Sequence, residues 1–248
     1  MIILDIAANE LCRTGKSPFA WIILAVMQFL LAIFFFLLLS QYLQITSPDI
    51  SSGLTDVVAA GTLQTAGLLL LMVSPFLTMR LFSDEQRGGT LNLLMSSPVS
   101  MTEMVLGKYL GIVTFLLCML MLIALMPLSL LFGTNLDLGQ LACGLIGLAL
   151  LMSSFAAIGL FISTLTRQPA VAAISTFGLL FLLWIIHITG NTGNEKLMAI
   201  LSYLSMLRHY NNFLSGMFNS IDIIYYLLIS AIFIVLSIWR LDALRTLP

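Results

Sequence analysis

The chain has 248 residues, of which 60% are hydrophobic and 8% are charged, with a net charge of −1. Soluble domains carry about 25% charged residues. With a mean hydropathy of +1.09, this composition excludes a soluble domain of any size. It also excludes a nucleic-acid-binding protein, because no basic patch is large enough to hold a phosphate backbone.

The charged residues fall into short clusters that leave six charge-free runs. The runs are 17–48, 57–79, 109–136, 138–166, 168–194 and 223–239. A bilayer core takes roughly 20 apolar residues per helix, and a charge at its centre costs roughly 2.5–3.5 kcal/mol. The pattern predicts an all-α polytopic membrane protein with one domain, 1–248. Its six predicted transmembrane helices lie at about 18–42, 57–79, 101–130, 138–164, 169–189 and 222–240.

The N-terminal segment has an amphipathic pattern. Within 1–16, Ile3, Ala7 and Leu11 share one helical face. This predicts a short helix that lies on the membrane interface, with a frayed tail as the alternative. Ser17 precedes a proline, and this pair predicts the N-cap and first residue of the first span.

The basic residues predict the orientation of the chain. Eight of the ten lie in the two tails and in alternate connections: Arg13, Lys16, Arg80, Arg87, Lys108, Arg167, Arg240 and Arg245. Lys196 and Arg208 are the exceptions. The positive-inside rule makes the basic side cytoplasmic, so both termini are expected there.

A long external connection, 190–222, separates the last two predicted spans. Its charge-free stretch 197–207 is too short to cross a bilayer and suits a re-entrant or interfacial helix. A polar break at the outer surface, 208–212, and a second apolar piece, 213–218, complete an expected external re-entrant hairpin.

The cytoplasmic connection 80–103 contains the most specific sequence of the chain. Ser83, with a glutamine three residues on, has the pattern of a helix start. The pair Gly88-Gly89 allows the backbone to bend sharply after this first short helix.

The second half of that connection is amphipathic. Leu91, Leu94 and Met95 share one helical face, and Pro98 stops the helix. A short amphipathic helix between two spans suits docking into a groove on a cytoplasmic partner. The alternative is an interfacial helix that only closes the loop. Ser100, with a glutamate three residues on, predicts a capping box that begins the third span.

Over about 25 residues this segment resembles the signature of ABC-2 type (type V) ABC transporter permeases. The matching residues are Asp84-Glu85-Gln86-Arg87-Gly88-Gly89-Thr90-Leu91, Leu94, Ser97-Pro98-Val99-Ser100, Glu103 and Gly107-Lys108. Asn92 departs from the family, since many members carry Glu there, and the glycine pair has one glycine more than the tightest version. The tail 204–241 is similar to the gliding-motility and nitrous-oxide-reductase-maturation permeases.

The resemblance implies a permease subunit of an ATP-driven exporter in the bacterial inner membrane, not itself an enzyme. Gly107-Lys108 lacks the upstream glycine of a phosphate-binding loop and precedes Tyr109, so a separate ABC ATPase subunit would bind ATP and Mg²⁺. No cofactor is expected on this chain. A second copy or a sibling permease would complete the pathway, and a periplasmic or membrane accessory protein is a further candidate partner. The resemblance assigns coupling to the ATPase to Ser83, Asp84, Glu85, Arg87, Gly88, Gly89, Thr90, Leu91, Leu94 and Pro98.

Other polar and small residues within the spans have structural interpretations. Gln28 and Gln64 could line a pathway, but hydrogen bonding between helices is the favoured interpretation. His187 is a candidate ligand or proton relay, with a plain interfacial role favoured. No metal site follows from the spacing of the two histidines. Cys118 and Cys143 are expected to pack in the core.

Two stretches of small residues predict close helix packing. They are Gly107-x-x-x-Gly111 and the set Ala149, Ser153 and Ala157.

Two other classes of function compete with the exporter. An intramembrane enzyme is disfavoured, since the chain has neither His-Glu-x-x-His nor Gly-x-Ser-x-Gly, and no acidic residue lies in the six runs. A secondary transporter or channel without ATP coupling is the alternative, although it usually needs buried ionisable groups or broken helices. The cargo, and whether the machine exports it or does mechanical work on a partner, stay open.

Overall fold

The computed structural model describes residues 2–44, 53–89, 100–132, 136–186 and 203–246, and within these ranges it contains helices and no strand. The α-helices are α1 Ile2–Lys16, α2 Pro18–Gln44, α3 Ala60–Thr78, α4 Arg80–Arg87, α6 Met101–Ser129, α7 Leu138–Leu165, α8 Pro169–Ile185, α10 Met206–Leu214 and α11 Ser220–Thr246. A π-helical turn, Thr55–Ala59, precedes α3, and a 3₁₀ turn, Leu130–Phe132, follows α6.

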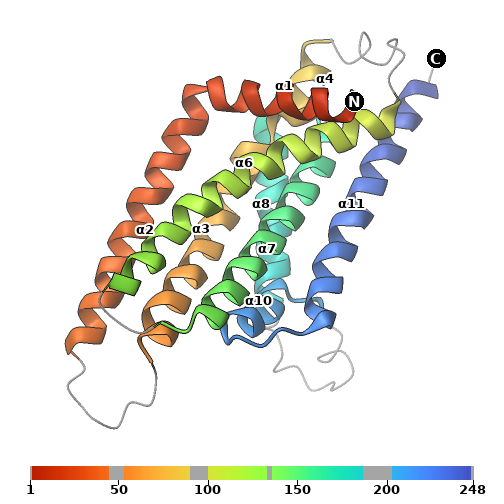
Figure 1. The fold of residues 1–248 in the computed structure, drawn as a ribbon. Coiled ribbons are helices and arrows are strands. Elements are labelled where there is room, and N and C mark those ends of the chain that lie inside the picture. The colour runs from red at the N-terminus through yellow and green to blue at the C-terminus, as the bar shows by residue number, and fades with distance from the viewer. Residues whose placement is uncertain (1, 45–52, 90–99, 133–135, 187–202, 247–248) are drawn as a thin grey trace.

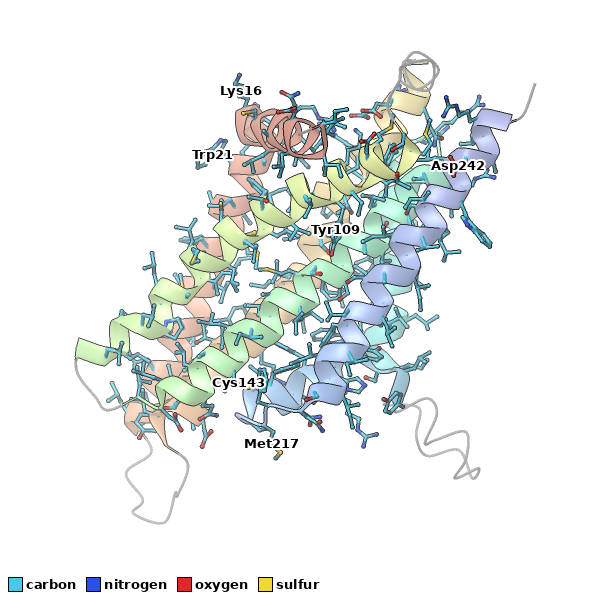
Figure 2. The ribbon with its side chains drawn as sticks, turned by 45° about the vertical axis from the view of Figure 1, so that its right-hand side comes forward. Lys16, Trp21, Tyr109, Cys143, Met217 and Asp242 are labelled. Atoms are coloured by element: carbon cyan, nitrogen blue, oxygen red, sulfur yellow. The ribbon has the colours of Figure 1, made fainter. Side chains whose placement is uncertain are left out.

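The long helices pack side by side into one bundle (Figure 1). Helix α1 lies across one end, together with α4 and both chain termini, and we call this the α1 end. Helix α10 lies at the opposite end, which we call the α10 end. Figure 2 shows Lys16 and Asp242 at the α1 end and Met217 at the other. In the described part of the chain the basic residues gather at the α1 end, as the sequence predicts, with Arg208 at the α10 end.

Five helical stretches are long and apolar enough to cross a membrane: Pro18–Gln44, Thr55–Arg87, Met101–Ser129, Leu138–Leu165 and Ser220–Arg245. The predicted fifth span corresponds to α8, which is apolar but has 17 residues. An all-helical, multi-pass membrane protein is therefore confirmed, and the count of six spans stays a prediction.

The outside of the bundle is apolar where a bilayer would cover it. Helix α2 buries only Ala20, Met27 and Leu31, while side chains such as Phe29 and Phe36 are exposed on it. Helix α7 buries most of its length and forms the centre of the bundle. Large exposed apolar surfaces are rare on soluble monomers, so this exterior fits a lipid environment.

The predicted N-terminal helix is present as α1, and it packs on the first turns of α6. Its place at the membrane interface stays a prediction. A Cβ atom at Gly107 would lie 2.6 Å from Ile6 Cγ2, and one at Gly111 would lie 2.9 Å from the carbonyl oxygen of Ala7. The predicted small-residue packing is confirmed, and its partner is α1.

The second set of small residues also lies at a helix contact. The Ser153 hydroxyl on α7 lies 2.8 Å from the Tyr109 hydroxyl of α6 and 3.3 Å from that of Ser230 on α11. Tyr109 lies between α6 and α7 in Figure 2.

The helix start predicted at Ser83 is wrong. Helix α4 begins at Arg80, and Met79, which separates it from α3, keeps right-handed helical dihedral angles of φ −56° and ψ −29°. The Ser83 hydroxyl donates to the carbonyl of Met79 one turn back, so it does not cap a helix. Helices α3 and α4 thus form an almost continuous rod.

The predicted glycine break and capping box are confirmed. Helix α4 ends at Arg87, and Gly89 has a φ of +70°, a left-handed conformation that favours glycine. Ser100 Oγ accepts from the Glu103 amide at 3.2 Å, and the Glu103 carboxylate accepts from the Ser100 amide at 3.0 Å.

The cysteine prediction is half right. Cys143 is buried in the core, as expected, whereas Cys118 is exposed on α6. Core packing of Cys118 is therefore wrong, because its face of α6 points away from the bundle.

Candidate functional site

Lys108, two turns inside α6, is buried at the α1 end with 4% of its surface exposed. Its Nζ atom donates to the carbonyl oxygen of Leu81 at 2.7 Å and to Glu85 Oε1 at 2.5 Å. It also lies 3.5 Å from Glu10 Oε2 and 4.9 Å from the centre of the Phe82 ring. One ammonium group therefore joins α6 to both α4 and α1.

Arg13 on α1 completes the arrangement. Its Nη2 atom lies 2.6 Å from Glu10 Oε1, and its Nη1 atom lies 3.8 Å from Glu85 Oε1. We call Glu10, Arg13, Glu85 and Lys108 the charge cluster. Its two carboxylates and two cations balance, so each buried charged side chain has a partner of opposite sign.

An adjacent face of α4 is bonded to the end of α7. The amide of Phe82 donates to Ser163 Oγ at 2.8 Å, and Gln86 Nε2 donates to the carbonyl oxygen of Thr164 at 2.8 Å. Nearby, Gly159 allows close approach, because a Cβ atom there would overlap the side chain of Thr78. Helix α4 is thus held by α1, α6 and α7 together.

The predicted coupling residues separate into two groups in the structure. Asp84, Arg87 and the glycines at 88 and 89 are exposed at the tip of α4. Ser83 is buried, and the Glu85 side chain is 14% exposed and turned toward Lys108. Asp84 and Arg87 are therefore available to a partner, whereas Glu85 fixes the position of α4. Thr90, Leu91, Leu94 and Pro98 lie outside the described residues.

The candidate pathway residues do not converge. Gln28 Nε2 on α2 donates to the carbonyl oxygen of Leu122 on α6 at 3.0 Å, in agreement with a role in helix contact. Gln64 is exposed on α3. His187 lies outside the described residues.

The α10 end contains a second polar cluster that the sequence analysis missed. The polar break predicted at 208–212 is wrong, because these residues belong to α10, and His209 is 4% exposed. Its Nδ1 atom lies 2.5 Å from Asp222 Oδ1 on α11, and its Nε2 atom lies 2.9 Å from the carbonyl oxygen of Tyr203. Asn212 Nδ2 donates to Asp222 Oδ2 at 3.1 Å, and the imidazole stacks on Tyr225 at 4.1 Å.

Helix α10 packs into the bundle through aromatic side chains. The Tyr210 hydroxyl donates to the carbonyl oxygen of Leu63 at 2.7 Å, and burial raises the pKa of this phenol, which keeps it a neutral donor. A Cβ atom at Gly147 would lie 2.6 Å from Phe213 Cβ. The spacing of Met206, Tyr210 and Phe213 on one helical face could have predicted this buried helix.

Within the described residues, no group of three or more His, Cys, Asp or Glu side chains could hold a metal ion. The charge cluster joins α1, α4 and α6. Its chemistry is that of a rigid joint between helices.

Comparison with known proteins gives one match that spans the chain. The family model described as "ABC-2 family transporter protein" matches residues 4–243. No curated protein matches the chain. The matched range includes all the residues that form the charge cluster and the polar cluster at the α10 end.

Proposed function

The chain belongs to the ABC-2 transporter family, and from this premise we propose that it is the permease subunit of an ATP-driven exporter in the bacterial inner membrane. Members of this family are membrane components of ABC transporters and normally work with an ABC ATPase subunit. ATP and Mg²⁺ would be bound by that subunit, and this chain would supply the path or the lever through the membrane.

The distribution of charge supports an orientation with the α1 end in the cytoplasm. Eight basic residues, from Arg13 to Arg245, gather at this end, and the positive-inside rule places such an end on the cytoplasmic side. Both termini lie there as well (Figure 1). The exposed tip of α4 would then face the compartment that contains ATP.

The single observation that carries the proposal is the bonding of α4 on three sides. A loop that only connected the second and third predicted spans would not need a buried ammonium group that holds its first helix, α4, against α6. In our proposal the ATPase contacts the exposed residues at the tip of α4, which are Asp84, Arg87, Gly88 and Gly89, and the chain that follows them. Because Glu85 and Leu81 are bonded to Lys108, a displacement of the tip moves α6 and α1 with it.

The same displacement would reach the far side of the bundle. Helix α4 is almost continuous with α3, and α3 contacts α10 through the hydrogen bond between Tyr210 and Leu63. Movement of packed rods against one another is an established way to transmit a conformational change. Helix α10, as part of a re-entrant hairpin on the outer side, would be the element that receives it.

The assembly around this chain is part of the proposal. A second copy or a sibling permease would complete a pathway, and an accessory protein could receive mechanical work instead of a cargo. The resemblance of the tail to the gliding-motility and nitrous-oxide-reductase-maturation permeases favours the mechanical version. The apolar spans between the charge cluster and the polar cluster at the α10 end would suit an amphipathic or lipid-linked cargo in the export version.

Site-specific photo-crosslinking tests the docking surface. A photoreactive amino acid at Arg87 should crosslink to an ABC ATPase expressed with the chain, and the same amino acid at Met217, exposed at the α10 end, should not. The proposal fails if the ATPase co-purifies but is captured equally from both positions, or from Met217 alone.

A further inference from the structure

A groove lies at the α1 end, next to the charge cluster: Arg80 and Asp84 line it and also line a smaller cavity with Glu10 and Arg13. The groove has a volume of about 1040 Å³ and lies between the start of α2, the rod formed by α3 and α4, and the turn from α7 to α8. Its polar lining includes Arg80, Asp84 and Arg87 from α4, and Arg167 and Gln168 from the turn.

Three arginines and one carboxylate line this groove, so its charge is positive. Arg80 lies over the Phe19 ring at 5.0 Å. Among the described residues, Arg80, Arg87 and Arg167 form no ion pair, although Asp84 lines the same groove. Three guanidinium groups that no carboxylate in the described ranges neutralises provide a site for an anion, and the planar guanidinium matches a phosphate group well.

An apolar slot continues from the groove along α3 and α8. It has a volume of about 270 Å³ and is lined by Met72, Pro75, Phe76, Ala173, Ile174 and Phe177. Phe76, Ala173 and Ile174 line both spaces. The cationic groove and the apolar slot therefore form one continuous amphipathic site.

We propose that this site binds an anionic phospholipid of the leaflet at the α1 end. The phosphate would lie among Arg80, Arg87 and Arg167, and one acyl chain would occupy the slot beside Ile174. A soluble anion would use the arginines but leave the slot unfilled. A bound lipid would link Arg87, at the tip of α4, to the α7–α8 turn, so its binding would be sensitive to the position of α4.

Lipid retention measures the proposal directly. The full chain, in a zwitterionic detergent, is incubated with phosphatidylglycerol or phosphatidylethanolamine, and bound lipid is quantified by native mass spectrometry. The chain should retain phosphatidylglycerol preferentially. A basic residue near an anionic lipid contributes about fivefold in affinity, so the double variant Arg87→Gln/Arg167→Gln should lose roughly twentyfivefold.

Arg245→Gln is the matched control, since Arg245 is exposed at the same end but on α11, outside the groove. It should keep the binding of the unchanged chain. An equal loss of phosphatidylglycerol binding in this control would show that the overall positive charge of the α1 end is sufficient for binding. That result overturns the proposal, and so does unchanged binding in the double variant.

Three further measurements separate a lipid from other occupants. Ile174→Trp, at a side chain that is 73% exposed, fills the slot without disturbing the core and should weaken phosphatidylglycerol binding. If glycerol phosphate at equal concentration displaces phosphatidylglycerol, the site binds a soluble anion and the lipid proposal is overturned. A photoreactive amino acid at position 174 should give a lipid adduct in membranes. Crosslinking to a second copy of the chain, with no lipid adduct, would identify a protein interface and overturn the proposal.

Discussion

The Lys108 ammonium group of α6 and the Glu85 carboxylate of α4 lie 2.5 Å apart in a site where both side chains are largely buried. The two residues are 23 positions apart and lie on either side of the connection between the second and third predicted spans. The pair closes that connection at its base, so the exposed tip between them is presented on a rigid support. This support is what the proposed coupling requires.

Removing the ammonium group should destabilise the protein. Lys108→Met leaves Glu85 and Glu10 with less compensation in a buried site, and breaking a buried ion pair costs about 3–5 kcal/mol. Lys16→Met, at an exposed lysine of α1, is the control and should change stability by less than about 0.5 kcal/mol. Denaturant unfolding in detergent micelles measures both, and equal stabilities would show that the pair does not hold α4.

The turn after α4 should require glycine at only one of its two positions. Gly89→Ala places an L-residue in a left-handed conformation and should cost about 1–2 kcal/mol. Gly88 has a φ of −77°, so Gly88→Ala should be nearly neutral. Denaturant unfolding measures the stability of both variants. A Gly88→Ala variant that is less stable than the Gly89→Ala variant would contradict the backbone conformation of this turn.

Close packing of α1 on α6 should depend on the absence of a side chain at Gly111. Gly111→Leu would press a Cβ atom against the carbonyl of Ala7, which cannot move independently of α1. The amides of α1 should then exchange hydrogen for deuterium at least roughly tenfold faster, which corresponds to about 1.4 kcal/mol. In Gly178→Leu the new side chain meets open space on α8, and exchange of α1 should stay unchanged. If the α1 amides stay equally protected from exchange in both variants, α1 does not pack against Gly111.

The polar cluster at the α10 end should stabilise α10 against α11. Asp222→Leu removes the carboxylate that contacts His209 Nδ1 and accepts from Asn212, and leaving such groups without a partner costs roughly 2–5 kcal/mol. Asp5→Leu, at an exposed position of α1, should have little effect. Hydrogen exchange of α10 reports the loss, and a slow-exchanging α10 in Asp222→Leu would show that the aromatic packing suffices.

The one-dimensional features of the fold could be predicted from the sequence. Charge spacing predicts the long helices, and local rules predict the capping box at Ser100 and the break at Gly88-Gly89, because each depends on residues within a few positions. The start of α4 was misplaced because Ser83 bonds to the carbonyl one turn back, an option that competes with capping for any serine in a helix.

The contacts that build the candidate site could not be predicted in the same way. Glu10, Glu85 and Lys108 come from three helices, and no local pattern states that they meet. For Lys108 the sequence does indicate that a partner exists, because this lysine lies two turns inside a long apolar helix, where a charge needs a partner. The contact between His209 and Asp222 could not be predicted from composition. A polar stretch between two apolar pieces has the same composition whether it lies at a surface or forms the buried polar face of a helix.

ATP hydrolysis by the assembled complex of Glu85→Gln/Lys108→Met tests the central claim most directly. The double variant removes the ion pair without leaving either charge alone, so it should fold and bind the ABC ATPase. The account predicts that the complex forms but hydrolyses ATP only at the rate of the isolated ATPase subunit, because α4 no longer moves α6. Hydrolysis at the rate of the unchanged complex, with the same amount of bound ATPase, would contradict the account.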